Sequence, residues 1–123
     1  MSDLWETHDI THMLYSCVNA QIIWSLVTAA TGYTINPNKI ILGTQNESEN
    51  FLISQISYYL YKRFIQTSND PQLPITIKSD LQYFSRELSY KLKIYNKCNA
   101  LKPFVHDIKR VVIGLMENAL QLN

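Results

Sequence analysis

Two histidines one helical turn apart are the residues of this chain best spaced to bind a metal ion. His8 and His12 form an H-x-x-x-H pair, which on a helix points both imidazoles to one side, as zinc binding requires. A third ligand, His106 or a cysteine, would have to come from a distant part of the chain. The metalloprotease motif also requires a glutamate where Asp9 stands. Surface histidines on a first helical turn are therefore the better interpretation, and we expect no metal site.

Other patterns that support catalysis are missing from the sequence. The three glycines are isolated and cannot form a phosphate-binding loop, and neither G-x-S-x-G nor C-x-x-C occurs. Serines and threonines are frequent, but none has neighbours that mark it as a nucleophile. We therefore expect no catalytic residues, no cofactor and no enzymatic activity.

An aromatic and basic cluster lies in the middle of the chain, at Tyr58, Tyr59, Tyr61, Lys62 and Arg63. On a helix these side chains point to different faces, which predicts one tyrosine in the core and the others on a partly exposed flank. A platform for stacking RNA bases is the alternative, although such platforms usually carry more positive charge.

Charge is distributed unevenly along the chain. Residues 1–50 carry one basic and five acidic residues, whereas residues 78–110 carry eight basic and three acidic residues. Solvated helix faces, an acidic partner or a modest nucleic-acid contact would each explain this pattern. The candidates for a nucleic-acid contact are Lys39, Lys78, Lys91 and Lys93. So few charges predict weak, salt-sensitive binding at most.

Length and composition favour one soluble intracellular domain over residues 1–123. The chain is 46% hydrophobic and 11% aromatic, which suits a packed core rather than disorder. The first residues are acidic, whereas a signal peptide begins with positive charge and a transit peptide is rich in arginine, so we expect neither. The two cysteines, Cys17 and Cys98, are expected to be reduced.

Helical periodicity runs through most of the sequence and predicts an all-α fold. A first helical region covers 3–31, with a break near 19–21 as an alternative, and ends at Gly32. Asn36 and Pro37 begin a second region that runs toward 65. It is either one long helix or a helix that restarts at Asn46 with Glu49 as a capping box. Further helices are expected at 79–97 and from Pro103 to the end.

The segment "ITIKSDL" at 75–81 places a β-branched stretch directly before a helix. Ile75, Thr76 and Ile77 predict a very short strand, and Ser79 is the expected cap of the following helix, with Asp80 in its first turn. Since an isolated two-stranded pairing is marginal in water, such a strand is expected to pair with 34–35 or with another chain.

The order of these features resembles the histone fold. The "LVTAATGY" ending at 26–33, the helix start "NPNKII" and the "ITIKSDL" segment are most similar to the histone-fold TBP-associated factors of TFIID and SAGA, and also to centromere histone-fold proteins. The resemblance implies helices at 17–31, 37–66 and 79–90, a core of about 17–90, an added helix at 3–16 and a C-terminal helical extension over 91–123. It also implies a head-to-tail obligate dimer with another histone-fold protein, inside a nuclear transcription or chromatin complex.

Such a dimer would share its core between two chains, because a long helix flanked by short ones cannot bury both its faces. The expected partner-binding residues are Leu26, Val27, Ile41, Leu52, Ile56, Leu60, Phe64, Ile77 and Leu81; their alternative role is an ordinary intramolecular core. A four- or five-helix bundle is the alternative fold. It would serve as a monomeric adaptor or inhibitor in the cytoplasm, or as a DNA-binding subunit. A break near 43–46 would count against the histone-like arrangement.

Overall fold

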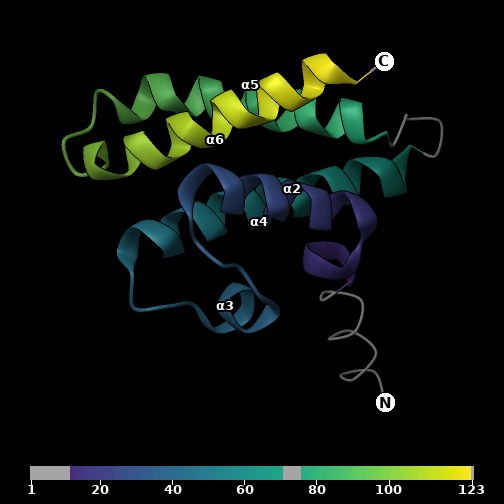
Figure 1. Ribbon diagram of the computed structural model, residues 1–123, viewed down its shortest axis with the longest axis horizontal. Helices are drawn as coiled ribbons and strands as arrows, with labels where there is room; N and C mark the ends of the chain where they lie inside the picture. Colours follow the sequence, from purple (N-terminus) through teal and green to yellow (C-terminus); the bar gives the residue numbers. More distant parts are fainter. Residues whose placement is uncertain (1–11, 71–75, 123) are drawn as a thin grey trace.

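The computed structural model describes residues 12–70 and 76–122. Over these residues the chain is all-helical, as the sequence predicted, and the very short strand expected at 75–77 does not form at Thr76 or Ile77. Its elements are η1 (His12–Ser16), α2 (Val18–Thr31), α3 (Pro37–Leu42), α4 (Glu47–Asn69), α5 (Ile77–Tyr95) and α6 (Lys102–Gln121). Figure 1 shows α5 and α6 as a hairpin that lies against α2 and α4, with α3 on the side away from the hairpin.

Local capping residues set several helix ends where the sequence predicted them. Gly32 ends α2 in the left-handed conformation, with φ of 84°, which an L side chain adopts only at a cost. Asn36 caps α3, because its side-chain oxygen accepts a hydrogen bond from the Lys39 N–H at 2.9 Å. Pro37 follows at the first helical position, where no backbone donor is needed.

The alternative of one long helix over 37–66 is wrong, because the chain breaks between α3 and α4. Gly43 has a φ of 82°. Asn46 caps a new helix by accepting a hydrogen bond from the Glu49 N–H at 2.9 Å. The Asn50 side chain holds the intervening turn, accepting from the Thr44 N–H at 2.6 Å and donating to the Thr44 carbonyl. The predicted cap at Asn46 is therefore confirmed.

The predicted reciprocal bond from the Glu49 side chain is replaced by an ion pair. Glu49 is buried, and its carboxylate lies 2.8 Å from Lys39 Nζ, which also donates to the Thr34 carbonyl at 2.7 Å. This pair ties α3 to the start of α4, so the turn between them is held from both sides.

The start of α5 corrects the expected strand and the expected cap. Thr76 is the cap, since its hydroxyl accepts from the Ser79 N–H at 3.0 Å while the Ser79 hydroxyl accepts from the Thr76 N–H at 3.2 Å. Ile77 is already the first helical residue. Ile75 lies outside the described residues. The reciprocal capping box extends the helix two residues beyond the start that the sequence indicated.

The N-terminal region also divides differently from the prediction. The π-helical turn η1 ends at Ser16 and α2 begins at Val18, so the break lies at Cys17 instead of near 19–21. The Trp24 indole Nε1 donates to the Leu14 carbonyl at 2.6 Å, which holds η1 against α2. Residues 3–11 of the predicted helix lie outside the described part of the chain.

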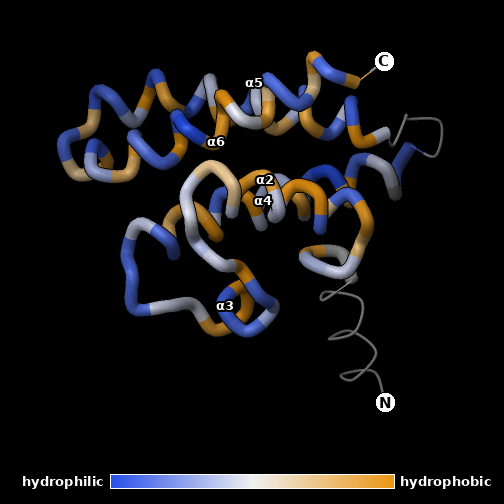
Figure 2. The backbone as a smooth tube through the Cα atoms, viewed as in Figure 1, coloured by the Kyte–Doolittle hydropathy of each residue, from blue (hydrophilic) through white to orange (hydrophobic). Residues whose placement is uncertain are grey.

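The core forms where the hairpin of α5 and α6 meets α2 and α4. Figure 2 shows the hydrophobic α2 in the middle of the molecule, between the hairpin and α3. Four helices contribute the largest fully buried side chains, which are Tyr59, Phe84, Ile23, Leu52, Ile56, Leu81, Leu88, Ile108, Leu115, Val27 and Val111. The helix beyond residue 90, α6, thus completes the same core as the helices before it.

Candidate interaction surface

Most of the residues predicted to bind a partner lie inside this chain's own core. Val27, Leu52, Ile56, Leu60 and Leu81 are buried. The hairpin of α5 and α6 covers the apolar faces of α2 and α4 that the sequence assigned to a second chain. These side chains take the intramolecular role that was the alternative, and none of the five presents a free surface here.

The other four predicted residues differ in exposure. Leu26 and Ile77 are half-buried against the edge of the core. Ile41 on α3 and Phe64 on α4 are exposed. Ile41 and Phe64 are therefore the predicted residues that a partner can reach, and they lie on different helices.

Phe64 belongs to a row of large side chains on the outer face of α4. Tyr58, Tyr61, Phe64 and Ile65 are between 38% and 51% exposed, and we call them the α4 outer face. Residues three and four apart are neighbours on a helix surface, so these four form one continuous strip. The sequence prediction of one core tyrosine and an exposed flank is confirmed, because Tyr59 is buried whereas Tyr58 and Tyr61 are exposed.

Aromatic and cation–π contacts hold part of this face in place. The Tyr58 ring packs edge-on against Tyr59, with centroids 5.4 Å apart. Lys62 Nζ lies 5.4 Å from the centroid of Tyr58 and 5.9 Å from that of Tyr59. Such contacts contribute about 0.5–1 kcal/mol at exposed sites. Because Tyr58 is already ordered, a partner that docks on it loses little side-chain entropy.

A buried ion pair fixes the part of α4 that carries the outer face. Arg63 Nε lies 2.6 Å from Asp80 Oδ1, and the two side chains are only 12% and 6% exposed. Asp80 Oδ2 accepts a second hydrogen bond from Asn19 Nδ2 at 2.7 Å, and Arg63 Nη2 donates to Ser79 Oγ at 3.0 Å. This network joins α2, α4 and α5, so the last turns of α4 are held in one position.

Two tyrosine hydroxyls beneath the face are buried. Burial away from water raises the pKa of both Tyr59 and Tyr83, with a further contribution from Glu87. Among the described residues, neither hydroxyl has a hydrogen-bond partner. The rings of Tyr59, Tyr83 and Phe84 pack edge-on with centroids 5.6 to 6.1 Å apart. Both phenols stay protonated at neutral pH, and they serve packing.

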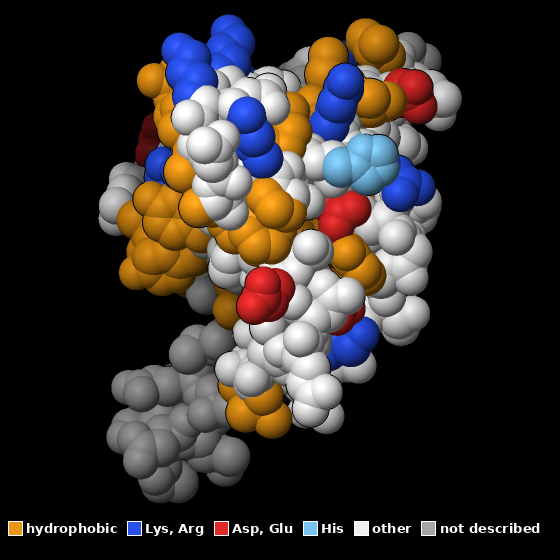
Figure 3. Space-filling model, turned by 90° about the vertical axis from the view of Figure 1, so that its left-hand side faces the viewer, with side chains coloured by type: hydrophobic (Ala, Val, Ile, Leu, Met, Phe, Trp, Pro, Cys, Tyr) orange, Lys and Arg blue, Asp and Glu red, His pale blue; other side chains and the backbone are white. Residues whose placement is uncertain are grey.

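The four lysines predicted to contact nucleic acid are not brought together. Lys39 lies on α3 and is paired with Glu49. Lys78, Lys91 and Lys93 lie on α5, which is at the top of Figure 1, whereas α3 is at the bottom. Lys93 is exposed, and Lys78 and Lys91 are half-buried. Figure 3 shows basic side chains gathered at the end where α5 and α6 lie, with hydrophobic side chains below them on one flank.

The predicted histidine pair cannot be placed, since His8 and the side chain of His12 lie outside the described part of the chain. Over residues 12–70 and 76–122, no group of three or more His, Cys, Asp or Glu side chains is arranged to hold a metal ion. None of the helices described combines the length and hydrophobicity needed to cross a membrane.

Exposed apolar residues on α5 and α6 were not among the predicted site residues. Tyr90 and Ile94 on α5 and Ile113, Met116 and Leu120 on α6 are each at least 47% exposed. Their helical spacing could have revealed them, because the members of each set lie one or two turns apart along one side of their helix.

Comparison of the chain with protein-family models, with curated proteins and with solved structures gave no match. Function is therefore inferred from the residues and their arrangement.

Proposed function

We propose that this chain is a non-enzymatic protein-interaction module that forms its core from its own helices and binds a partner protein through the α4 outer face. The observation that carries the proposal is the row of half-exposed Tyr58, Tyr61, Phe64 and Ile65 on a helix whose other side is buried. Aromatic residues are enriched at the centres of interfaces, where they supply contact area at low entropic cost. A contiguous apolar strip of this kind is a common sign of a docking surface.

The partner segment that fits this face is apolar and acidic. Lys62 lies over the Tyr58 ring within the strip. Residues 78–110, on the adjacent hairpin, carry eight basic and three acidic residues. Acidic side chains beside the apolar anchors of a partner would meet this positive potential, which speeds association and disfavours basic competitors.

Selection of binders from a random peptide display library against the immobilised chain tests the proposal. We expect enriched peptides to combine aromatic or aliphatic residues with Asp or Glu, and to lose binding to a Tyr58→Ser, Tyr61→Ser double variant. Tyr90→Ser is the matched control, because Tyr90 is a similarly exposed tyrosine on a different helix. A library that yields no binder, or binders that hold the double variant as tightly as the native chain, would contradict the proposal.

Pairing with a histone-fold protein, in a nuclear transcription or chromatin complex, is a second form of the interaction proposal that we favour less. That pairing needs a long unbroken helix and an apolar face left open for the second chain. The break at 43–46 and the burial of Leu52 and Ile56 within this chain weigh against it. The two forms of the proposal predict different behaviour for the chain when it is expressed without a partner. A self-contained module unfolds cooperatively, whereas an obligate half is unfolded or aggregated without its partner.

Nucleic-acid binding is the other candidate, supported by the exposed Lys93 on α5 and by the eight basic residues of 78–110. Binding by so few phosphate contacts would be weak and would fall steeply with salt. Titration of labelled duplex DNA and of single-stranded RNA at low ionic strength distinguishes this candidate, and absence of binding there removes it.

A further inference from the structure

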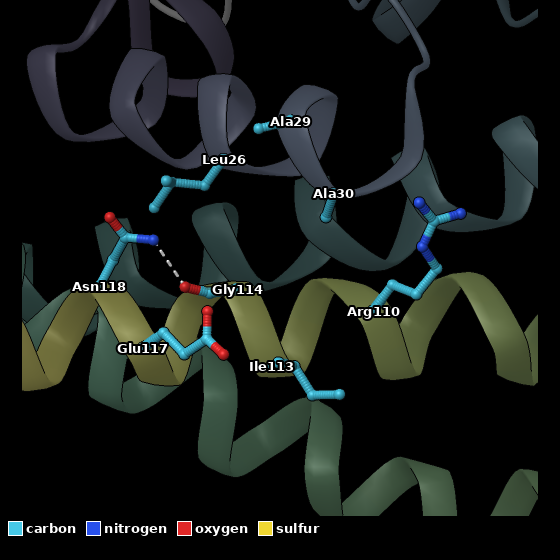
Figure 4. Close-up of a pocket in the computed structure, with 8 residues that line it drawn as sticks. All are labelled: Leu26, Ala29, Ala30, Arg110, Ile113, Gly114, Glu117 and Asn118. Carbon is cyan, nitrogen blue, oxygen red and sulfur yellow. Dashed lines mark hydrogen bonds between the residues drawn. The ribbon is translucent and has the colours of Figure 1, made fainter.

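The structure contains a groove between α2 and α6, on elements that the α4 outer face does not use. Its volume is about 420 Å³. Figure 4 shows Ala29 and Leu26 on the α2 side, Ile113 on the α6 side, and Ala30 facing Gly114 between the two helices. A Cβ added to Gly114 would lie 3.9 Å from the Ala30 Cβ, so the glycine leaves room beside the groove.

Two opposite charges mark the groove along α6. Arg110 and Glu117 both line it, and in Figure 4 they flank Ile113 along the helix. Over residues 12–70 and 76–122, neither side chain forms an ion pair. Seven residues at 1.5 Å rise separate their Cα atoms by about 10.5 Å along the axis. An occupant with the same two charges in the reverse order would therefore pair with both.

The helix α6 is itself such an occupant. Positions 110 and 117 are equally distant from the midpoint between Ile113 and Gly114. When two copies of α6 lie antiparallel about a two-fold axis at that midpoint, each Arg110 faces the other copy's Glu117. The same rotation brings each Ile113 against the other copy's Gly114. Contacts of this reciprocal kind, in which residue i meets j and j meets i, define two-fold interfaces.

The outer face of α6 beside the groove is apolar enough to support this pairing. Ile113, Met116 and Leu120 are 47%, 49% and 83% exposed and lie on one side of the helix, three to four residues apart. We propose that two copies of this chain form a two-fold dimer through antiparallel α6 helices, each seated in the α2–α6 groove of the other. Both the shape and the charges of the required partner are present in this chain, which favours a second copy over a different protein.

The interface consists of one helix and the edge of another from each copy. Specific interfaces of that extent lie at the small end of the known range, below about 1,200 Å² in total, and form reversible complexes. We therefore expect monomer and dimer to exchange at micromolar chain concentrations, with each copy folded whether or not it is paired.

Charge exchange at the two positions tests the pairing in sedimentation equilibrium at low salt. Arg110→Glu alone, or Glu117→Arg alone, turns both attractive contacts of the dimer into repulsive ones, and should weaken association roughly tenfold or more. The double variant Arg110→Glu, Glu117→Arg restores both pairs and should dimerise like the native chain. Lys93→Glu is the matched control, since it makes the same charge change on α5 as the first variant and should leave the dimer intact.

A mixture of the two single variants gives the sharpest result. One copy then carries glutamate at both positions and the other carries arginine at both, so the mixture should associate although neither component does. Circular dichroism verifies that each variant keeps the native helix content, which is expected because both residues lie on the surface. A native chain that is monomeric at all concentrations overturns the proposal, as does a dimer that neither single variant weakens or that the mixture fails to restore. The readout is mass, so failure here is distinct from failure of partner binding at α4.

Discussion

Removing Arg63 should destabilise the whole helical unit, because it leaves Asp80 buried without its counter-charge. The Arg63 and Asp80 side chains are 12% and 6% exposed, with Nε and Oδ1 2.6 Å apart. Breaking a buried pair by removing one partner typically costs about 3–5 kcal/mol. A domain of ordinary stability has only about 5–15 kcal/mol in total, so Arg63→Ala should be folded but marginal.

Urea unfolding followed by far-ultraviolet circular dichroism measures this loss. With a slope of about 1–3 kcal/mol per molar urea, the midpoint should fall by about 1–5 M. Lys62→Ala is the control at the neighbouring position, where loss of an exposed cation–π contact should cost only about 0.5–1 kcal/mol.

Replacing both partners should cost far less than replacing one. Arg63→Met with Asp80→Leu substitutes apolar groups of similar volume, and such exchanges of buried pairs are often neutral or stabilising. The double variant is expected to recover most of the stability that Arg63→Ala loses. An Arg63→Ala midpoint within error of the native value would show that the pair is solvated and would refute this reasoning.

Three further effects are expected. Tyr59→Phe removes a buried hydroxyl that has no partner among the described residues, so the free energy of unfolding should rise by about 1 kcal/mol in urea titrations. Asp107 accepts a hydrogen bond from the Tyr33 hydroxyl at 2.7 Å, and this bond with burial raises the Tyr33 pKa to about 12. The stability that the bond contributes should therefore be complete below pH 10 and should be lost as the pH rises from 10 to 12. Comparing the pH dependence of unfolding of the native chain and of Asp107→Asn measures this loss. Gly43→Ala places an L side chain at a φ of 82° and brings its Cβ to 3.4 Å from the Asn50 amide oxygen. The variant should lose about 1–2 kcal/mol of unfolding free energy, seen as a lower melting temperature, while α3 and α4 stay separate helices.

Helix ends were predictable from the sequence because their causes are local. Gly32, Asn36 and Asn46 each act through a backbone conformation or a hydrogen bond within three or four residues. The cap of α5 was misplaced by three residues because Thr76 and Ser79 are both good caps. Only their reciprocal bonding in three dimensions shows that Thr76 begins the helix and Ser79 supports it.

The role of the apolar stripes was not predictable in the same way. Leu52 and Ile56 mark a buried face of α4, but periodicity does not tell whether the covering side chains come from the same chain or from another. Here Leu81 and Phe84 on α5 and residues of α6 complete that core, more than twenty residues away along the chain. The histone-like interpretation placed residues beyond 90 outside the core, so their contribution was missed.

The two proposed surfaces have a joint consequence that follows from symmetry. Antiparallel pairing of α6 uses α2 and α6, so it leaves the α4 outer face of each copy uncovered. A two-fold dimer would then present two identical aromatic strips on one particle. A partner that carries two copies of the acidic, apolar segment could engage both, and the second contact would form at the effective concentration set by the spacing of the strips. Weak contacts at each strip would then be sufficient for firm attachment to a paired or repetitive partner, while a single segment would dissociate quickly. The Arg110→Glu variant should therefore attach more weakly to a surface that carries many copies of the partner segment, while its affinity for a single free segment should be unchanged.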